Sequence, residues 1–233
     1  MKIAIIPARG GSKRIPHKNI VDFCGKPMIS YALKVAEKSG LFDKIHVSTD
    51  SPKIAEVVQS LGVEVDFMRS AKLADDHTGI MPVLENVLNE YDRHGQIFNH
   101  IMVLMPCCPL LLPEDIISGY EVYSSFNGER PLHVVAPYPA PIEWAYRRNA
   151  NGVLIPKNPG AYAIRSQDFE PAYYECGPFS LFHRNHIFSK IPSTDEGFCS
   201  ITLPRTRAVD IDEHEDLLFA ESMFRALKPE VEC

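Results

Sequence analysis

A glycine pair surrounded by cations stands near the N-terminus, in the stretch ARGGSKRIPHKN at residues 8–19. Residues 1–21 hold five Lys and Arg side chains and no acid, whereas the whole chain has a formal net charge of -6. Glycines let backbone N–H groups approach an anion, and a hydroxyl and cations beside them can neutralise a polyphosphate. The spacing matches neither a P-loop nor a dinucleotide-binding fingerprint. The stretch therefore indicates a local anionic ligand, with a solvated basic turn as the alternative.

Two carboxylates stand two residues apart near the C-terminus, in VDID at residues 209–212. On an extended strand, Asp210 and Asp212 point to the same side and can share one hard cation with phosphate oxygens. Mg²⁺ takes such oxygen ligands. The alternative is a capping box in which Asp212 and Glu215 begin the last helix, although this leaves Asp210 unexplained.

Short β-rich runs that alternate with helical patterns must position these groups. Strands are expected at 2–7, 44–49, 63–67, 99–105 and 132–138, and helices at 27–39, 52–61, 80–93 and 113–125. Pro27, Pro52 and Pro113 suit the first turns of three of these helices. The alternation predicts an α/β fold with a mostly parallel twisted sheet flanked by helices on both faces. Ligands of such sheets bind beyond the carboxyl ends of the strands, which is where residues 8–19 follow the first strand.

The alternation fails from about residue 137 to 175, a stretch rich in Pro, Asn and aromatic residues. We interpret it as an inserted hairpin or arm that packs on a partner subunit or over the active site. The chain then returns to the sheet near 178–182 and again at RAVDID, residues 207–212, before a last amphipathic helix. A length of 233 residues predicts a single domain, 1–233, that carries this arm.

Composition excludes several classes of protein. The apolar runs fall far short of the roughly 20 residues that span a bilayer. The cysteines show no C-x-x-C spacing of the kind that zinc sites use. Overall acidity argues against nucleic acid, because a nucleic-acid-binding protein spreads cations over a face instead of gathering them in one loop. We expect a cytoplasmic protein with neither a membrane nor a nucleic acid as partner.

These residues also carry a resemblance to a known family. The stretch IPARGGSKRIPHKNI at 6–20 closely resembles the signature of the cytidylyltransferases that activate nine-carbon sialic-acid-like sugars, and GKPMISYAL, VSTDSPKIAEV, LADDHTG and DIDEHEDL follow in the family's order. The stretch RSQDFEPAYYECGPF at 165–179 is most similar to the pseudaminic acid branch. The resemblance implies a Rossmann-like nucleotide-diphospho-sugar transferase fold that dimerises through the arm. It also implies an enzyme that couples CTP to a 2-keto sugar acid, giving the CMP-sugar and pyrophosphate with Mg²⁺ as cofactor.

The resemblance assigns roles to individual residues. It implies that the CTP triphosphate lies on the N-terminal loop, and that the nucleotide-binding residues are Ala8, Arg9, Gly10, Gly11, Ser12, Lys18, Asn19, Arg69, Asp76 and Thr78. It makes Asp210 and Asp212 metal ligands and, with Arg9 and Lys18, the catalytic residues. The sugar is expected to contact Met105, Cys108 and Phe179, and also Arg165, Gln167 and Tyr173 of the arm, within one subunit or across the dimer. A solvated cation is the alternative at Arg69, and a helix N-cap is the alternative for at least one residue of 75–78; Asp50 is assigned to capping the helix that begins at Pro52.

One departure from the family bears on the substrate. Sialic acid enzymes of the family usually carry a Gln, hydroxyl residues and Pro-Leu-Arg after the fourth strand, whereas this chain reads MPCCPLL at 105–111. This stretch offers sulfur and hydrocarbon, which suits pseudaminic acid because that sugar ends in a methyl group and carries acylated amines. The alternative is that part of the stretch is simply the buried end of the strand.

We therefore expect the anomeric 2-hydroxyl of pseudaminic acid to attack the α-phosphate of CTP, with no general base evident from sequence. The nearest alternatives are cytidylyltransferases for N-acetylneuraminic acid, legionaminic acid or an eight-carbon sugar acid. An Asp-x-Asp glycosyltransferase holds only a diphosphate and has less need of the dense basic loop. A non-catalytic nucleotide-binding protein could dispense with the aspartate pair.

Overall fold

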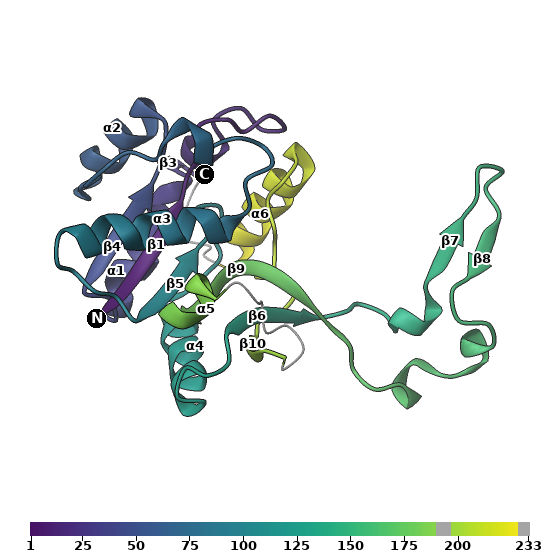
Figure 1. The fold of residues 1–233 in the computed structure, drawn as a ribbon. Helices are drawn as coiled ribbons and strands as arrows, with labels where there is room; N and C mark the ends of the chain where they lie inside the picture. Colours follow the sequence, from purple (N-terminus) through teal and green to yellow (C-terminus); the bar gives the residue numbers. More distant parts are fainter. Residues whose placement is uncertain (190–196, 228–233) are drawn as a thin grey trace.

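A computed structural model describes residues 1–189 and 197–227, and its centre is a six-stranded sheet in the order β10-β6-β9-β5-β1-β4 (Figure 1). The strands are β1 (Lys2–Pro7), β4 (Lys44–Ser48), β5 (His100–Leu104), β6 (Leu132–Pro137), β9 (Tyr173–His183) and β10 (Cys199–Thr202). Strand β9 runs antiparallel to its neighbours β5 and β6, and the other neighbouring pairs are parallel. The predicted mostly parallel sheet is confirmed.

Helices cover both faces of this sheet. They are α1 (Ile29–Ser39), α2 (Pro52–Ser60), α3 (Ile80–Arg93), α4 (Pro113–Ser125) and α5 (Arg184–Phe188). Strand β1 shows why its sequence is a continuous apolar run: Ala4 and Ile6 join the core that α1, α2 and α4 cover, whereas Ile3 and Ile5 join the core under α3 and α5. Successive side chains of a strand point to opposite faces, so a strand that is covered twice needs apolar residues throughout.

A third core cluster joins the two ends of the chain. It packs α6 (His214–Leu227) against a short hairpin of β2 (Asp22–Phe23) and β3 (Lys26–Pro27). The rings of Phe23, Tyr31 and Phe224 meet edge to face, each pair with 5.4 Å between centroids. Ile15 and Ile211 belong to the same cluster. The basic loop and the aspartate pair are therefore fixed to one another by packing.

Residues 138–172 leave the sheet between β6 and β9 and project from the body of the protein (Figure 1). The hairpin that the sequence predicts in this arm is present as β7 (Tyr146–Arg148) and β8 (Leu154–Pro156). At its base, Trp144 donates from Nε1 to the carbonyl of Ala161 at 3.1 Å. The Trp144 ring also contacts Tyr162 and Phe169, so a small aromatic cluster shapes the arm.

Three expected elements differ from the structure. Residues 63–67 form no strand; Val63 and Val65 pack on the first core cluster, but their backbone joins no ladder. Pro27 lies in β3, and the following helix begins at Ile29.

Residues 207–212, expected as a strand, are irregular, and the edge strand of the sheet is β10 instead. The reason is a turn in which the amides of Arg207 and Ala208 bond to the carbonyl of Pro204, a residue that cannot donate to a ladder. Within residues 1–189 and 197–227, no helix is long and apolar enough to cross a bilayer.

Candidate active site

A cavity of about 310 Å³ lies at the carboxyl ends of β1 and β5. The cations of the loop after β1 line it, together with Asp210 and Asp212 from the segment before α6; these cations are Arg9, Lys13, Arg14 and Lys18. Its volume is within the usual range for small-molecule sites. The structure thus brings together the two groups of residues that the sequence singled out, although about 190 residues separate them along the chain.

Lys18 joins the basic loop directly to the aspartate pair. Its Nζ donates to the carbonyl of Ile211 at 2.6 Å and to Asp212 Oδ1 at 3.0 Å. Arg14 pairs with the other carboxylate oxygen of Asp212 at 2.7 Å. Partial burial acts to raise the pKa of Asp212, but the hydrogen bonds from Lys18 and Arg14 outweigh it and lower the pKa. Asp212 is therefore an ionised carboxylate that two cations already hold.

Asp210 has the opposite environment. In the part of the chain that the structure describes, its carboxylate makes no hydrogen bond or ion pair. Loss of solvation, followed by the charge of Asp212, raises the pKa of Asp210 above its ordinary value. The side chain borders both this cavity and a second, larger one. A carboxylate with unmet charge beside a paired carboxylate is a place where a bound cation would relieve repulsion.

Asp216 caps the last helix. Its Oδ2 accepts hydrogen bonds from the backbone N–H groups of Asp212 at 2.9 Å and Glu213 at 2.7 Å. The capping box of Asp212 and Glu215 is therefore wrong, because the acid that reaches back is one residue later. This arrangement leaves the carboxylate of Asp212 to face the cations of the loop.

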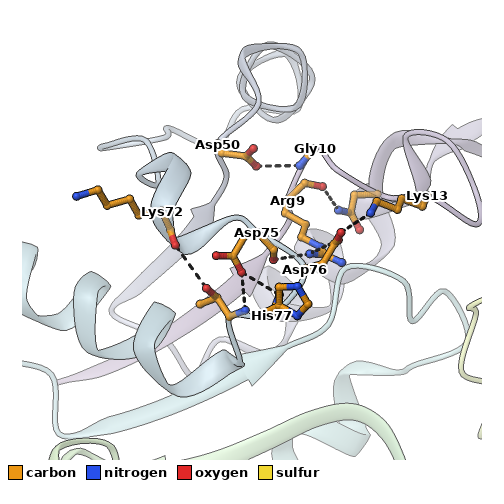
Figure 2. Close-up of polar contacts among 10 residues, drawn as sticks. Arg9, Gly10, Lys13, Asp50, Lys72, Asp75, Asp76 and His77 are labelled. Carbon is orange, nitrogen blue, oxygen red and sulfur yellow. Dashed lines mark hydrogen bonds and ion pairs between the residues drawn. The ribbon is translucent and has the colours of Figure 1, made fainter.

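Asp50 holds the basic loop in place, a role that sequence reasoning missed. Its Oδ1 accepts a hydrogen bond from the N–H of Gly10 at 2.8 Å (Figure 2). The helix after Asp50 is capped by Ser51, whose Oγ accepts from the N–H of Ile54 at 3.4 Å, so the assignment of Asp50 to capping is wrong. One signal was available: Asp50 follows β4, which pairs with β1, and the carboxyl ends of parallel neighbours meet at one edge.

The two glycines of the loop differ in what they make possible. A Cβ added at Gly10 would lie 2.9 Å from the Cβ of Ser51, whereas one added at Gly11 would meet nothing within 4 Å. The N–H of Gly10 donates to the carboxylate of Asp50, and Gly10 does not line the first cavity. Gly10 is thus required for close packing of loop against helix.

Asn19 ties the far end of the loop to the cavity wall. It is buried, donates from Nδ2 to the carbonyl of Arg9 at 2.9 Å, and accepts at Oδ1 from the thiol of Cys107 at 3.4 Å. Ser12 and Asn19 both line the first cavity, as the prediction of nucleotide contacts requires.

Residues 75–78 lie beside the basic loop, and Asp76 forms ion pairs with its remaining two cations (Figure 2). Asp76 pairs with Arg9 at 3.1 Å and also with Lys13, and the hydrogen bond from Lys13 is the main cause of its lowered pKa. Arg9 additionally donates to the carbonyl of Asp75 at 2.6 Å. All four loop cations that line the first cavity therefore pair with one of two carboxylates, Asp76 or Asp212.

Other residues predicted to contact the nucleotide serve the scaffold. Ala8 is fully buried, and its N–H donates to the carbonyl of Ser48 at 2.9 Å. Arg69 is buried and donates to Ser48 Oγ at 3.0 Å and to the Ser48 carbonyl at 2.8 Å. The N–H of Thr78 donates to Asp75 Oδ1 at 2.7 Å, which closes a turn before α3. Ala8, Arg69 and Thr78 line neither cavity.

The stretch 105–111 divides between cavity and core. Met105 is 41% exposed and borders both cavities, whereas Cys108, Leu110 and Leu111 are buried. Cys107 and Cys108 line the first cavity as neutral thiols, because burial raises the pKa of Cys107 to about 12 and that of Cys108 still further from its usual range. A neutral thiol is neither a strong nucleophile nor a metal ligand.

A second cavity of about 610 Å³ adjoins the first and shares Met105, Gly177 and Asp210 with it. Its walls are largely apolar and include Phe179, Phe182, Ile187 and Phe198. Phe179 is therefore beside a cavity, as predicted. The remaining aromatic wall was missed, because alternating apolar residues on β9 look the same whether they face a core or a cavity.

Three residues of the arm were predicted to contact the sugar. Within one chain, none of them lines either cavity. Arg165 instead pairs with Asp168: its Nε donates to Oδ2 at 3.0 Å and its Nη2 donates to Oδ1 at 3.2 Å. Gln167 lies on the arm and Tyr173 is the first residue of β9, and neither residue lines a cavity. Contact between these residues and a sugar, within one subunit or across a dimer, stays a prediction.

Comparison with known proteins agrees with this geometry. A sequence model of the family described as "Cytidylyltransferase" matches residues 3–118. A pseudaminic acid cytidylyltransferase from Campylobacter jejuni is 34% identical over 229 residues, 96% of each chain. A CMP-N,N'-diacetyllegionaminic acid synthase from Legionella pneumophila is 31% identical over 153 residues, 66% of this chain and 65% of that one.

Similarity of fold extends to a solved structure of CMP:2-keto-3-deoxy-manno-octonic acid synthetase complexed with CTP. It aligns with a TM-score of 0.71 and covers 97% of this chain and 99% of its own. The identity is 18%, so this likeness shows the fold. The expected nucleotide-sugar transferase fold is confirmed.

Proposed function

The chain belongs to the cytidylyltransferase family, and from this premise we propose that it transfers CMP from CTP to a nine-carbon 2-keto sugar acid, pseudaminic acid. The observation that carries the proposal is the first cavity, where the cationic loop after β1 meets Asp210 and Asp212. The choice of sugar is supported by the pseudaminic acid cytidylyltransferase that matches 96% of this chain, whereas the legionaminic acid enzyme matches 66%.

The four loop cations are proposed to hold the triphosphate of CTP. Lys18 is the most firmly placed of them, because its side chain is 20% exposed and its Nζ is fixed by Ile211 and Asp212. Cations that are already in position stabilise charge on a departing pyrophosphate without reorganisation during the reaction. Arg9 and Lys18 therefore act on the transition state as well as on binding.

Asp210 and Asp212 fit Mg²⁺ as a cofactor. The lone carboxylate of Asp210 and the raised pKa that follows from its surroundings indicate an unmet negative charge. Proteins commonly hold magnesium by one or two carboxylates together with substrate phosphates and water, and the two aspartates that line the first cavity offer such a pair. When bound, the ion would neutralise phosphate charge and help to activate the attacking hydroxyl.

In the proposed reaction, the 2-hydroxyl oxygen of the sugar forms a bond to the α-phosphorus of CTP. The bond from the α-phosphorus to the bridging oxygen breaks, and pyrophosphate leaves with that electron pair while the hydroxyl loses its proton. The contribution of the chain is to align the two substrates and to neutralise the leaving group.

We further propose that the protein is a homodimer formed through the arm of about 137–175, with residues 1–233 as one domain. Exposed apolar side chains gather on this arm: Tyr138, Ile142, Tyr146, Val153, Leu154, Ile155, Tyr162, Ile164 and Tyr173. Large apolar side chains that are exposed in such number on one segment are typical of protein interfaces.

Pyrophosphate release tests the proposed function. CTP, Mg²⁺ and one sugar acid are mixed, and kcat/KM is expected to rank pseudaminic acid first, N,N'-diacetyllegionaminic acid second and N-acetylneuraminic acid last. Replacing CTP by ATP should abolish most turnover, because a site that pairs with cytosine leaves polar groups unpaired around adenine. Equal rates with ATP, or CTP binding without pyrophosphate release for any acid, would contradict the proposal.

A further inference from the structure

The second cavity contains a polar cluster in an otherwise apolar wall. His133 on β6 lies directly opposite Ser180 on β9, and its Nδ1 is 2.9 Å from Ser180 Oγ and 3.3 Å from Glu175 Oε1. Between His133 and Val135 the pairing with β9 shifts register, and Gly177 within the shift has a φ of +72°. Such an irregularity re-aims side chains at functional sites, and here it brings Glu175 beside His133.

The imidazole of His133 is held in one orientation. Its ring centroid is 4.0 Å from that of Phe198 and 6.3 Å from that of Phe182. Nδ1 lies between Ser180 Oγ at 2.9 Å and Glu175 Oε1 at 3.3 Å, and both oxygens can accept a hydrogen bond from an Nδ1–H group. On this ground we assign the ring proton to Nδ1. The loss of solvation also lowers the pKa of His133, against the opposing charge of Glu175, and so favours the neutral ring.

A neutral ring with its proton on Nδ1 has an unprotonated Nε2 that can accept a hydrogen bond. Within the described ranges, this atom has no hydrogen-bond partner and is not among the buried unpaired polar atoms. It is therefore accessible from the cavity that His133 lines. The other histidine of this cavity differs, because both nitrogens of His186 are engaged, with the N–H of His183 at 3.2 Å and near the carbonyl of Glu129 at 3.1 Å.

Nε2 of His133 stands beside the aromatic and aliphatic walls of the cavity, which the carboxylates of Glu175 and Asp210 also border, and its position suits a particular ligand group. An acylamino group offers an N–H donor with a small apolar acyl end beside it, which would face Phe182, Ile187 and Phe198. A chain of hydroxyls can donate to Nε2 as well, but its remaining polar atoms would lose their water against these walls without gaining partners.

We propose that the second cavity binds an N-acylated, deoxygenated part of the sugar acid and that His133 determines this specificity by accepting a hydrogen bond from an amide N–H. The inference rests on the proposed function, since it concerns the sugar of that reaction. The inference assigns recognition of the sugar to His133 on β6 and to the walls of the second cavity. The sequence instead predicts the apolar contacts from residues 105–111. Asp210, which borders both cavities, then stands where the sugar meets CTP.

Two substitutions at His133 and one elsewhere test the inference. His133→Phe keeps an aromatic ring against Phe198 but removes the acceptor, and His133→Gln retains an acceptor at the end of its amide. His100→Phe is the matched control: His100 is also half-buried in the sheet and hydrogen-bonded, to Tyr123 at 3.3 Å, but it lines neither cavity. Steady-state kinetics are measured with pseudaminic acid and with CTP as the varied substrate.

For His133→Phe we expect the KM for pseudaminic acid to rise about tenfold, while the KM for CTP changes less than about twofold. His133→Gln should recover part of the loss, and His100→Phe should resemble the wild type. The unchanged KM for CTP also shows that the variant is folded.

An unchanged KM for pseudaminic acid in His133→Phe, an equal rise with His100→Phe, or no recovery with His133→Gln would overturn the inference. A parallel rise in the KM for CTP would assign His133 a structural role and would overturn it too. If the wild type releases no pyrophosphate with any sugar acid, the proposed function itself fails.

Discussion

Replacing Gly10 by Ala should displace the basic loop without removing any of its functional groups. The added Cβ would stand 2.9 Å from Ser51 Cβ, where ordinary contact begins at 3.4 Å, so loop and helix must separate by about 0.5 Å. The same displacement strains the hydrogen bond between the N–H of Gly10 and Asp50, which is 2.8 Å long. The loop would then carry Arg9 away from the position that it has in the first cavity.

The size of the effect follows from these contacts. Overpacking of this kind costs about 1–3 kcal/mol of unfolding free energy. A hydrogen bond to a charged acceptor contributes about 1.5–3 kcal/mol, and only part of that is lost when the bond lengthens. Because a displacement of about 1 Å at a catalytic group can cost about a hundredfold, a shift of half that size should lower kcat/KM for CTP roughly tenfold.

Urea unfolding and steady-state kinetics with CTP would measure the two effects. Gly11→Ala is the matched control for stability, since its Cβ meets nothing within 4 Å and its unfolding free energy should change by less than about 0.5 kcal/mol. Ser51→Gly in the Gly10→Ala background removes the atom that the new Cβ meets and should restore part of the stability, at a capping cost of only a few tenths of a kcal/mol. Equal losses for Gly10→Ala and Gly11→Ala, or no recovery in the double variant, would refute the reasoning.

Four other changes have distinct expected outcomes. Asp212→Asn should remove most Mg²⁺-dependent turnover while circular dichroism stays native, and a near-normal rate would refute its metal role. Lys18→Ala should lower kcat/KM for CTP at least about tenfold, or about 1.4 kcal/mol, in the same assay. Asp76→Asn frees Arg9 and Lys13 from a carboxylate that competes with phosphate. Calorimetry should therefore show that CTP binds up to about fivefold more tightly. Weaker binding would instead indicate that Asp76 contacts the nucleotide. The hydrogen bond with His46 is the main cause of a lowered pKa of Asp66. A carboxylate with a lowered pKa stabilises the folded protein above about pH 4, and this stabilisation is lost as the pH falls further. Asp66→Asn should therefore make the free energy of unfolding less dependent on pH below about pH 4, as measured by acid unfolding.

Local signals were enough to predict several of the elements around the site, although not the irregular segment that carries Asp210 and Asp212. The helices at 80–93 and 113–125 have the expected bounds, because apolar periodicity and Pro113 determine them without distant contacts. Residues 63–67 show the limit of such signals. Their alternating valines do pack inward, but whether a strand has a partner depends on the order of strands in the sheet, and β4 is already the edge.

The choice among neighbouring capping residues could not be predicted from sequence. Asp50 and Ser51 were equally suitable as the cap of the helix at Pro52, and Glu215 and Asp216 were equally suitable as the acid that reaches back to the start of the last helix. The structure decides by what else each acid can reach: Asp50 meets Gly10 from a different strand, and Asp212 meets Lys18 from the other end of the chain. His133 was missed for the same reason, because its partner Ser180 is 47 residues away.

The pairing of loop cations with Asp76 and Asp212 bears on how the proposed reaction begins. Four cations within one short loop repel each other, and the two carboxylates balance them in the absence of a nucleotide. Phosphates that enter the cavity therefore exchange with carboxylates and do not simply add to a bare positive site. The two exchanges would differ in kind, because Asp212 lines the first cavity beside Asp210 and would hold the proposed metal with it, whereas Asp76 lines neither cavity. In this proposal the step that releases Lys18 and Arg14 from Asp212 would also bring phosphate to them, so the aspartate pair would favour the metal complex of CTP over free CTP. Because Asp212 pairs with Lys18 and Arg14, the loop and the aspartate pair, from opposite ends of the chain, must be packed together by a common core.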